Sequence, residues 1–193
     1  MKDDHLLWKK TDEKEFRGAY KRYLTRYFML PDGTMADFDV TTLKSGKFAM
    51  CLALTDDMKV VVAKQFRPGP QKVIYDMPAG ILEPGESAEE GIRRELLEET
   101  GHTPAELIAL NPDGNVIGPY DDALGVYFLA LGCKRTGKQK LDANERAEVG
   151  LLPLRTYVHE VLRKGLATHA DCGWLAIDRL MSMGKITYED IKP

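Results

Sequence analysis

The stretch over residues 80–102 constrains the fold more than any other part of the chain, because it specifies both ends of one helix. It reads GILEPGESAEEGIRRELLEETGH. Ser87 is a preferred N-cap residue, and Glu90 stands three positions later, where its side chain can return a hydrogen bond to the cap. Gly101 suits the left-handed conformation that ends many helices. The sequence therefore predicts a helix that begins at Ala88 and ends at this glycine.

Three glutamates gather on one face of this helix. Glu95, Glu98 and Glu99 stand at i, i+3 and i+4, which brings their carboxylates together within one turn. Like charges at this spacing repel, and Glu99 also continues the line of Ile92 and Leu96, where a purely structural helix would carry an apolar residue. A hard divalent cation resolves both problems, because Mg²⁺ takes several carboxylate oxygens as ligands. A merely solvated acidic face is the alternative.

The residues around these glutamates resemble the Nudix signature Gly-x5-Glu-x7-Arg-Glu-U-x-Glu-Glu-x-Gly-U, in which U is apolar. The matching positions here are Gly80, Glu86, Arg94, Glu95, Leu96, Glu98, Glu99 and Gly101. So many fixed positions in one register, on a capped helix, argue against a chance match. His102 departs from the pattern, but it lies beyond the helix and puts neither metal binding nor catalysis in doubt. By the same resemblance, Glu86 and Arg94 form a pair that pins the loop to the helix.

The resemblance implies an α/β fold, the Nudix α/β/α sandwich with a mixed β-sheet. It assigns the metal ligands to the carbonyl of Ala79 and the carboxylates of Glu95 and Glu99. Glu98 adjoins them as a catalytic residue. The implied cofactor is Mg²⁺, with Mn²⁺ as a possible substitute.

Two further runs resemble those of the ADP-ribose and nucleoside diphosphate sugar hydrolases in this family. Residues 65–68 read QFRP, and residues 76–80 read DMPAG, where that subgroup usually has E-x-PAG. Arg67 would bind the substrate diphosphate, since a guanidinium offers paired, charge-assisted hydrogen bonds. A surface arginine in a loop is the alternative. Asp76 replaces the glutamate that helps hold the substrate in relatives, and Pro119 falls where the subgroup carries a proline.

The resemblance places a catalytic base on a loop before the last strand. That loop covers residues 141–149, LDANERAEV. Glu145 is our choice for the residue that activates the attacking water, with Glu148 as the second candidate. A solvated acidic loop is the alternative for either residue.

These features predict Mg²⁺-dependent hydrolysis of ADP-ribose or a related nucleoside diphosphate sugar to a nucleoside monophosphate and a sugar phosphate. The small-molecule alternatives within the family are GDP-mannose, NADH and dinucleoside polyphosphates. A ligand sensor without catalysis is a rival of another class, and the intact Glu95, Glu98 and Glu99 count against it.

The first part of the chain has the pattern of a β-hairpin. Two β-prone runs, 20–30 and 35–43, flank Pro31-Asp32-Gly33, which is turn chemistry. Two strands alone are rarely stable, so this segment must pack on the rest of the chain or on a second subunit. We expect an N-terminal β segment over 1–46 that helps form a homodimer, as in related enzymes.

The Nudix domain is expected over 47–193. Its predicted strands cover 48–54, 60–65, 73–77, 106–110, 124–131 and 147–152. Its predicted closing helices cover about 155–164 and 170–183, each followed by a glycine.

The net charge and the composition limit the classes of binding partner that we expect. The formal net charge of −3 gives no basic field, so nucleic acid or an anionic membrane is not expected as a principal partner. No long apolar run or signal-peptide pattern occurs, and we expect a cytoplasmic protein. Cys51, Cys133 and Cys172 lack zinc-site spacing, and we expect them to be reduced and mostly buried.

Overall fold

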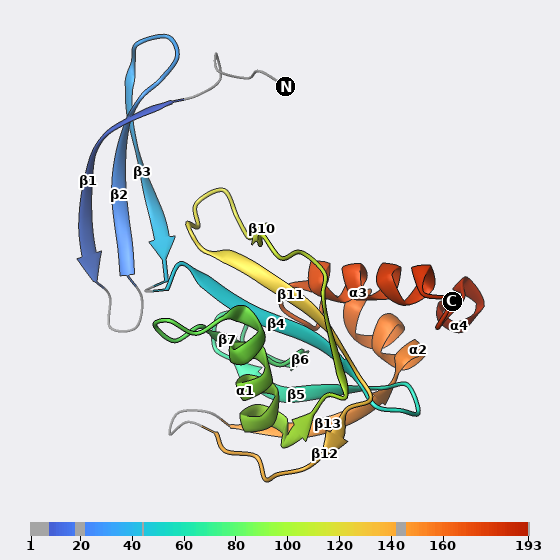
Figure 1. Ribbon diagram of the computed structural model, residues 1–193. Coiled ribbons are helices and arrows are strands. Elements are labelled where there is room, and N and C mark those ends of the chain that lie inside the picture. The colour runs from blue at the N-terminus through green and yellow to red at the C-terminus, as the bar shows by residue number, and fades with distance from the viewer. Residues whose placement is uncertain (1–7, 18–21, 44, 142–145, 193) are drawn as a thin grey trace. The chain divides into compact units, whose positions relative to one another are not determined.

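The computed structural model describes residues 8–17, 22–43, 45–141 and 146–192. The chain divides into two compact units (Figure 1). The N-terminal unit comprises Met1–Lys47 and Val116–Leu124, and the main unit comprises Phe48–Asn115 and Gly125–Pro193.

The N-terminal unit contains a three-stranded antiparallel sheet in the order β1-β2-β3. The strands are β1 (Lys9–Arg17), β2 (Arg22–Met29) and β3 (Met35–Thr42). The predicted hairpin corresponds to β2 and β3, and its turn contains Gly33 with a φ of 85°. β1 was not predicted, because its sequence KKTDEKEFR is mostly charged and every residue in it is exposed. Charged side chains of this kind are common on edge strands, where they oppose pairing with other chains.

A later segment of the chain completes this unit. Thr41 in β3 donates its N–H to the carbonyl of Tyr120 at 2.8 Å and accepts from the N–H of Asp122 at 3.1 Å. The carboxylate of Asp122 also accepts from Arg26 of β2 at 2.7 Å. Residues 116–124 therefore belong structurally with the N-terminal sheet, although they follow the predicted catalytic helix in sequence.

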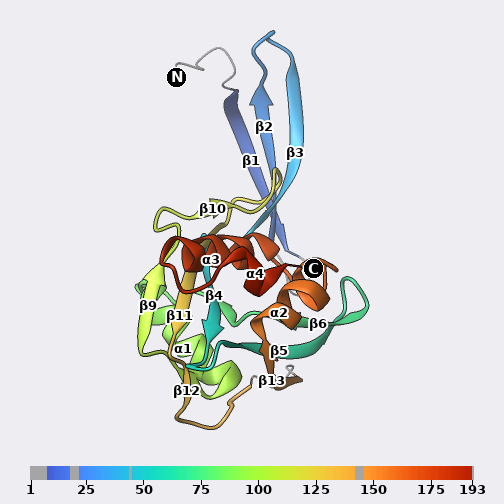
Figure 2. The same cartoon turned by 90° about the vertical axis from the view of Figure 1, so that its right-hand side faces the viewer.

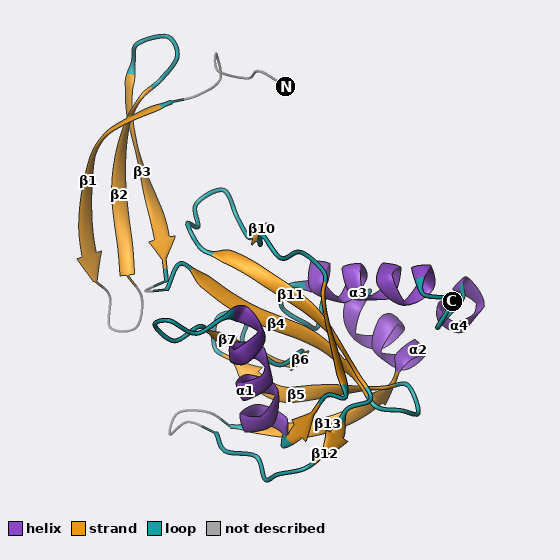
Figure 3. Ribbon diagram, viewed as in Figure 1, coloured by secondary structure: helices purple, strands orange, loops and turns teal. Residues whose placement is uncertain are grey.

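The main unit is built on a mixed sheet whose path runs β10-β11-β4-β5-β13, with β6, β7 and β9 pairing beside it (Figure 3). Its strands are β4 (Lys47–Leu54), β5 (Lys59–Arg67), β6 (Lys72–Asp76), β7 (Ala79–Ile81), β9 (Glu106–Ala109), β10 (Asn115–Val116), β11 (Leu124–Leu131) and β13 (Ala147–Pro153). A separate pair joins β8 (His102–Thr103) to β12 (Lys134–Arg135). The six predicted strands are confirmed, and the short strands β7, β8, β10 and β12 are additions.

Helices cover both faces of this sheet (Figures 1 and 2). They are α1 (Ala88–Thr100), α2 (Leu154–Thr156), η2 (Tyr157–Leu162), α3 (Ala170–Ser182) and α4 (Tyr188–Ile191). On one face, Ile92 and Leu96 of α1 pack with Cys51 of β4 and Val61 of β5 in a buried apolar cluster. α2, η2 and α3 lie on the opposite face. The predicted α/β/α sandwich is confirmed.

Both ends of α1 are as predicted. The Ser87 hydroxyl accepts from the N–H of Glu90 at 3.2 Å, and the Glu90 carboxylate accepts from the N–H of Ser87 at 2.9 Å. Gly101 adopts φ 72° and donates its N–H to the carbonyl of Leu97. Local hydrogen bonds thus define where the helix begins and ends.

The C-terminal helices differ from expectation in two details. The first predicted helix is α-helical only over α2 and continues as the π-helix η2, for which the sequence offers no explanation. The short helix α4 is an addition to the predicted helices, and Thr187 and Asp190 form a capping box at its start. No helix among the described residues is long and apolar enough to cross a membrane.

The three cysteines are free and buried, as expected. Burial raises the pKa of the Cys133 thiol to about 12. A thiol with so high a pKa is a poor nucleophile, so these residues serve as packing groups.

Candidate active site

Helix α1 holds two of its glutamates against the backbone of β7. The N–H of Ala79 donates to Oε2 of Glu99 at 3.1 Å. A Cβ built on Gly80 would lie 1.9 Å from Oε1 of Glu95, so this carboxylate rests directly on the glycine. The structure therefore brings together Ala79, Glu95 and Glu99, three residues that the sequence analysis grouped as metal ligands.

Arg94 is the centre of the charge network on α1. Its guanidinium makes two hydrogen bonds to Glu86, Nε to Oε1 at 2.8 Å and Nη2 to Oε2 at 3.0 Å, which confirms the predicted pair. Its Nη1 also donates to Glu95 at 2.7 Å and to Glu98 at 3.1 Å. The hydrogen bond from Arg94 lowers the pKa of Glu86. One arginine thus compensates three carboxylates that would otherwise repel.

The donor atoms at this position fit a hard divalent cation. Glu95, Glu99 and the backbone of Ala79 offer only oxygen ligands, which suit Mg²⁺ or Mn²⁺. Among the residues that the structure describes, no three His, Cys, Asp or Glu side chains are grouped closely enough to hold an ion. The expected set has only two such carboxylates beside a carbonyl oxygen, and Arg94 donates to Glu95 as well as to Glu98.

Arg67 at the end of β5 is held by a buried carboxylate. Its Nε and Nη2 each lie 2.9 Å from Oδ2 of Asp76, while Oδ1 of Asp76 accepts from the N–H and the hydroxyl of Thr168 at 2.9 and 2.8 Å. The side chain of Asp76 is 3% exposed. Both of its oxygens already have donors, so the geometry favours a role in orienting Arg67, and the expected role of Asp76 in holding substrate stays a prediction.

Arg67 shares a face of the sheet with α1. Side chains alternate along a strand, so Val61 and Arg67 of β5 point to the same side. Val61 packs against α1. The guanidinium is therefore presented on the side of the sheet that carries the three glutamates.

A family comparison agrees with this geometry. Residues 46–171 match the model of the NUDIX domain. The chain belongs to the Nudix family. It is 32% identical over 145 residues to the ADP-ribose pyrophosphatase of Bacillus subtilis (strain 168), covering 74% of this chain and 77% of that protein.

Two more similarities concern a second relative and the fold. It is 29% identical to the methanol dehydrogenase activator of Bacillus methanolicus, covering 69% of this chain and 71% of that protein. Its fold matches a crystal structure of an ADP compounds hydrolase with a TM-score of 0.78, at 17% identity, over 93% of this chain and 97% of the other. The chain is thus a Nudix hydrolase similar in sequence to ADP-ribose pyrophosphatases.

Of the two candidate bases of this Nudix enzyme, the structure describes only Glu148. Glu145 lies outside the described residues. Glu148 is in β13, where its 82% exposed side chain forms an ion pair with Lys64 at 3.5 Å. The adjacent Val149 packs against the cluster that contains α1 residues. Because neighbouring strand residues point to opposite faces, Glu148 points away from α1, which argues against its role as the base.

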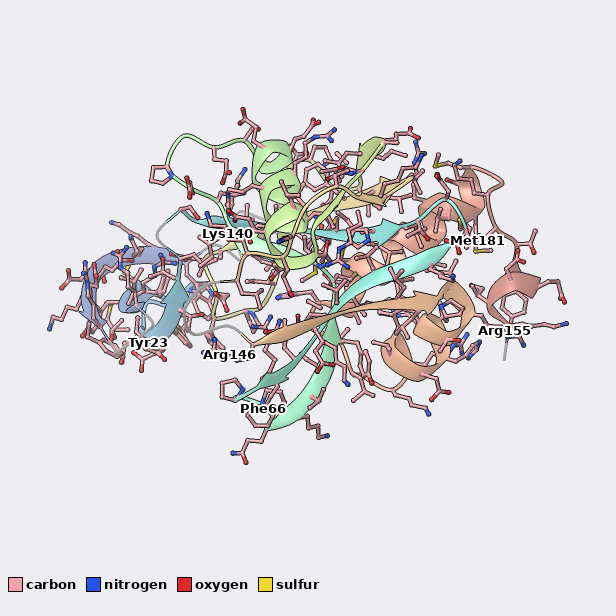
Figure 4. All side chains as sticks on the ribbon, turned by 90° about the horizontal axis from the view of Figure 1, so that it is seen from below. Tyr23, Phe66, Lys140, Arg146, Arg155 and Met181 are labelled. Atoms are coloured by element: carbon pink, nitrogen blue, oxygen red, sulfur yellow. The ribbon has the colours of Figure 1, made fainter. Side chains whose placement is uncertain are left out.

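Residues 139 and 140, which belong to no sequence motif identified above, connect α1 to β13. The N–H of Lys140 donates to the carbonyl of Glu98 at 2.7 Å. The side-chain amide of Gln139 donates to the carbonyls of Glu99 and Ala147 at 2.8 and 3.1 Å. Figure 4 shows Lys140 near α1 and Arg146 at the start of β13. Residues 139 and 140 therefore bind the last carbonyls of the glutamate-bearing helix, which a helix cannot satisfy by itself.

His102, the one departure from the Nudix signature, is accommodated by burial and one hydrogen bond. The residue is 5% exposed, and its Nδ1 lies 2.9 Å from the carbonyl of Thr100. Burial is the main cause of a lowered His102 pKa, and the charge of Arg135 acts in the same direction. The neutral imidazole therefore replaces the usual apolar side chain.

The N-terminal unit contains an aromatic cavity of its own. Its volume is about 340 Å³. The lining residues are Trp8, Arg26, Phe28, Phe38, Val40, Pro119, Tyr120 and Asp121. The rings of Trp8 and Phe38 lie 5.3 Å apart, and those of Phe38 and Tyr120 stack at 6.2 Å. Trp8 was not identified from the sequence, because a single aromatic residue near the beginning of a chain carries no pattern.

Proposed function

We propose that this Nudix hydrolase cleaves the diphosphate bond of ADP-ribose or a related nucleoside diphosphate sugar, with Mg²⁺ as the cofactor. The observation that carries the proposal is the placement of Glu95 and Glu99 against residues 79–80 on the face of the sheet that presents Arg67. The similarity to an ADP-ribose pyrophosphatase supports the substrate class. The products would be a nucleoside monophosphate and a sugar phosphate.

Each site residue then has a defined task. Glu95, Glu99 and the carbonyl of Ala79 would hold the cation, with Glu98 beside them. Bound Mg²⁺ supplies charge stabilisation for phosphoryl oxygens and lowers the pKa of water. Arg67 binds the diphosphate and aligns it for in-line attack. Glu145 accepts the proton of the attacking water.

A substrate panel tests this assignment and separates it from its rivals. ADP-ribose and other nucleoside diphosphate sugars, GDP-mannose, NADH and a dinucleoside polyphosphate are each incubated with Mg²⁺ and with Mn²⁺. The highest kcat/KM is expected for ADP-ribose or a nucleoside diphosphate sugar other than GDP-mannose. Preference for GDP-mannose, NADH or a dinucleoside polyphosphate would contradict the proposed substrate. Tight binding of ADP-ribose without turnover would instead support a sensor.

We also propose that the protein is a homodimer, with the N-terminal sheet packed on the partner and helping to build the substrate pocket. Large apolar side chains exposed in the N-terminal unit support the proposal. They are Trp8, Phe16, Met29 and Met35. Apolar surface of this kind is commonly covered by another chain.

A further inference from the structure

Thr168 connects the segment before α3 to the arginine of the candidate site. We propose that Thr168 is a positioning residue, which orients Arg67 toward the substrate diphosphate by fixing Asp76. The proposal deepens the proposed function and rests on it, because Arg67 is taken as the group that binds the diphosphate.

The contacts form a continuous chain of hydrogen bonds. Thr168 donates both its N–H and its hydroxyl to Oδ1 of Asp76, at 2.9 and 2.8 Å. The other oxygen, Oδ2, accepts from Nε of Arg67 at 2.9 Å, and Nη2 of the same guanidinium lies 2.9 Å from it as an ion pair. The two partners thus hold opposite oxygens of one carboxylate. Rotation of that carboxylate would disturb both ends together.

The segment that carries Thr168 is itself firmly held. The N–H of Tyr75 in β6 donates to the carbonyl of Leu166 at 2.8 Å. The next residue, His169, has φ 49° and ψ 51°, a left-handed conformation that residues with a Cβ rarely adopt. Its ring lies 4.8 Å from that of Phe48. Such strain persists only where surrounding contacts impose it, and it gathers at functional sites.

Burial explains why the arrangement fixes the arginine and not merely the aspartate. A buried carboxylate must be satisfied by donors, and Asp76 is 3% exposed with four donor contacts. Arg67 is 40% exposed, so only the edge bonded to Asp76 is anchored while the side chain still reaches solvent. Fixing a long side chain before substrate arrives reduces the entropy lost on binding.

The test compares two substitutions of Thr168 with a matched control. Thr168→Val removes the hydroxyl and keeps the shape, whereas Thr168→Ser keeps the hydroxyl. Thr187→Val is the control, because Thr187 donates its N–H and hydroxyl to one oxygen of Asp190 at 2.7 and 2.9 Å, in the capping box of α4. KM and kcat for ADP-ribose with Mg²⁺ are measured, together with the melting temperature.

Thr168→Val is expected to raise KM about three- to tenfold with kcat within about twofold, since one hydrogen bond that organises binding is lost. Thr168→Ser and Thr187→Val should keep the wild-type KM. In an Arg67→Gln background, Thr168→Val should change KM no further. Equal KM values for Thr168→Val and Thr168→Ser would overturn the proposal. So would an increase in KM by Thr168→Val that is as large in the Arg67→Gln background as in the wild type.

Binding of inorganic pyrophosphate, measured by calorimetry with Mg²⁺, separates this proposal from the reaction. Both Thr168→Val and Arg67→Gln are expected to bind pyrophosphate more weakly than the wild type. If they do so while the wild type does not hydrolyse ADP-ribose, the positioning role is supported and only the proposed substrate is rejected. Pyrophosphate affinity that neither substitution changes would overturn the positioning role. A wild-type protein that neither hydrolyses ADP-ribose nor binds pyrophosphate would overturn both.

Discussion

Gly80 has no side chain at the point where Glu95 comes closest to the main chain. An added Cβ would lie 1.9 Å from Oε1 and 2.5 Å from Cγ of that glutamate. The spacing of the glutamates along the sequence predicts their shared face. It does not reveal that Asp76 meets Thr168, because these two residues are 92 positions apart. Contacts of that range depend on the fold.

Gly80→Ala should separate catalysis from stability. The methyl group forces Glu95 to rotate away, and a displacement of about 1 Å in a catalytic group can lower kcat/KM roughly 100-fold. The clashing atoms belong to a flexible side chain, so the melting temperature should change little. Gly118→Ala is the control, since its added Cβ would meet its nearest atom at 3.9 Å. An alanine variant with wild-type kcat/KM would show that Glu95 needs no such contact.

Glu145→Gln should lower kcat about 10²- to 10⁴-fold with little change in KM, because a general base acts in the transition state. Glu148→Gln is the matched control on the same stretch of chain, and its side chain points away from α1. It should retain near-wild-type kcat. If the effect instead appears in Glu148→Gln and not in Glu145→Gln, the choice of base is wrong.

At the scale of elements, local chemistry decides what the sequence can predict. Ser87, Glu90 and Gly101 specify α1 at both ends, and the cap geometry confirms them. β1 escapes prediction because an exposed edge strand needs no apolar alternation. The π-helical turns of η2 have no sequence signal of this kind.

The buried His102 in the β8–β12 pair should make the free energy of unfolding depend on pH. Its pKa in the folded state is lowered from the ordinary value near 6.5. Above that value the imidazole is neutral in both states and has no effect on stability. As the pH falls below it, the unfolded chain takes up the proton first, so the free energy of unfolding decreases.

The free energy of unfolding should therefore decrease less between pH 7 and about pH 5 in His102→Leu than in the wild type. Urea unfolding of both proteins at several pH values measures it. A wild-type protein that gains stability over this interval, relative to the leucine variant, would contradict the account.

At the scale of the whole molecule, the sequence predicts an N-terminal β segment followed by a Nudix domain, but it cannot show which later residues join the first unit. Residues 116–124 return to it through the Arg26–Asp122 ion pair and the backbone of Thr41. This return pairs residues that are 96 positions apart, which no local pattern encodes.

Deletion of residues 1–45 tests the proposed homodimer. If the N-terminal sheet packs on the partner, light scattering should show a monomer, and kcat/KM for ADP-ribose should fall. Circular dichroism checks that the truncated chain is folded, because residues 116–124 lose their partners. A truncated chain that stays dimeric, or a folded monomer with undiminished kcat/KM, would refute the proposal.

The central claim is that the carboxylates of α1 support hydrolysis of a diphosphate bond. Release of AMP from ADP-ribose by the wild type and by Glu99→Gln, at equal Mg²⁺, tests it most directly. The glutamine oxygen can still accept from the N–H of Ala79, so the fold should be retained or slightly stabilised by the loss of a like charge. We predict that the wild type forms AMP and ribose 5-phosphate in equal amounts and that the folded variant forms almost none. Near-wild-type release of AMP by Glu99→Gln would contradict the account.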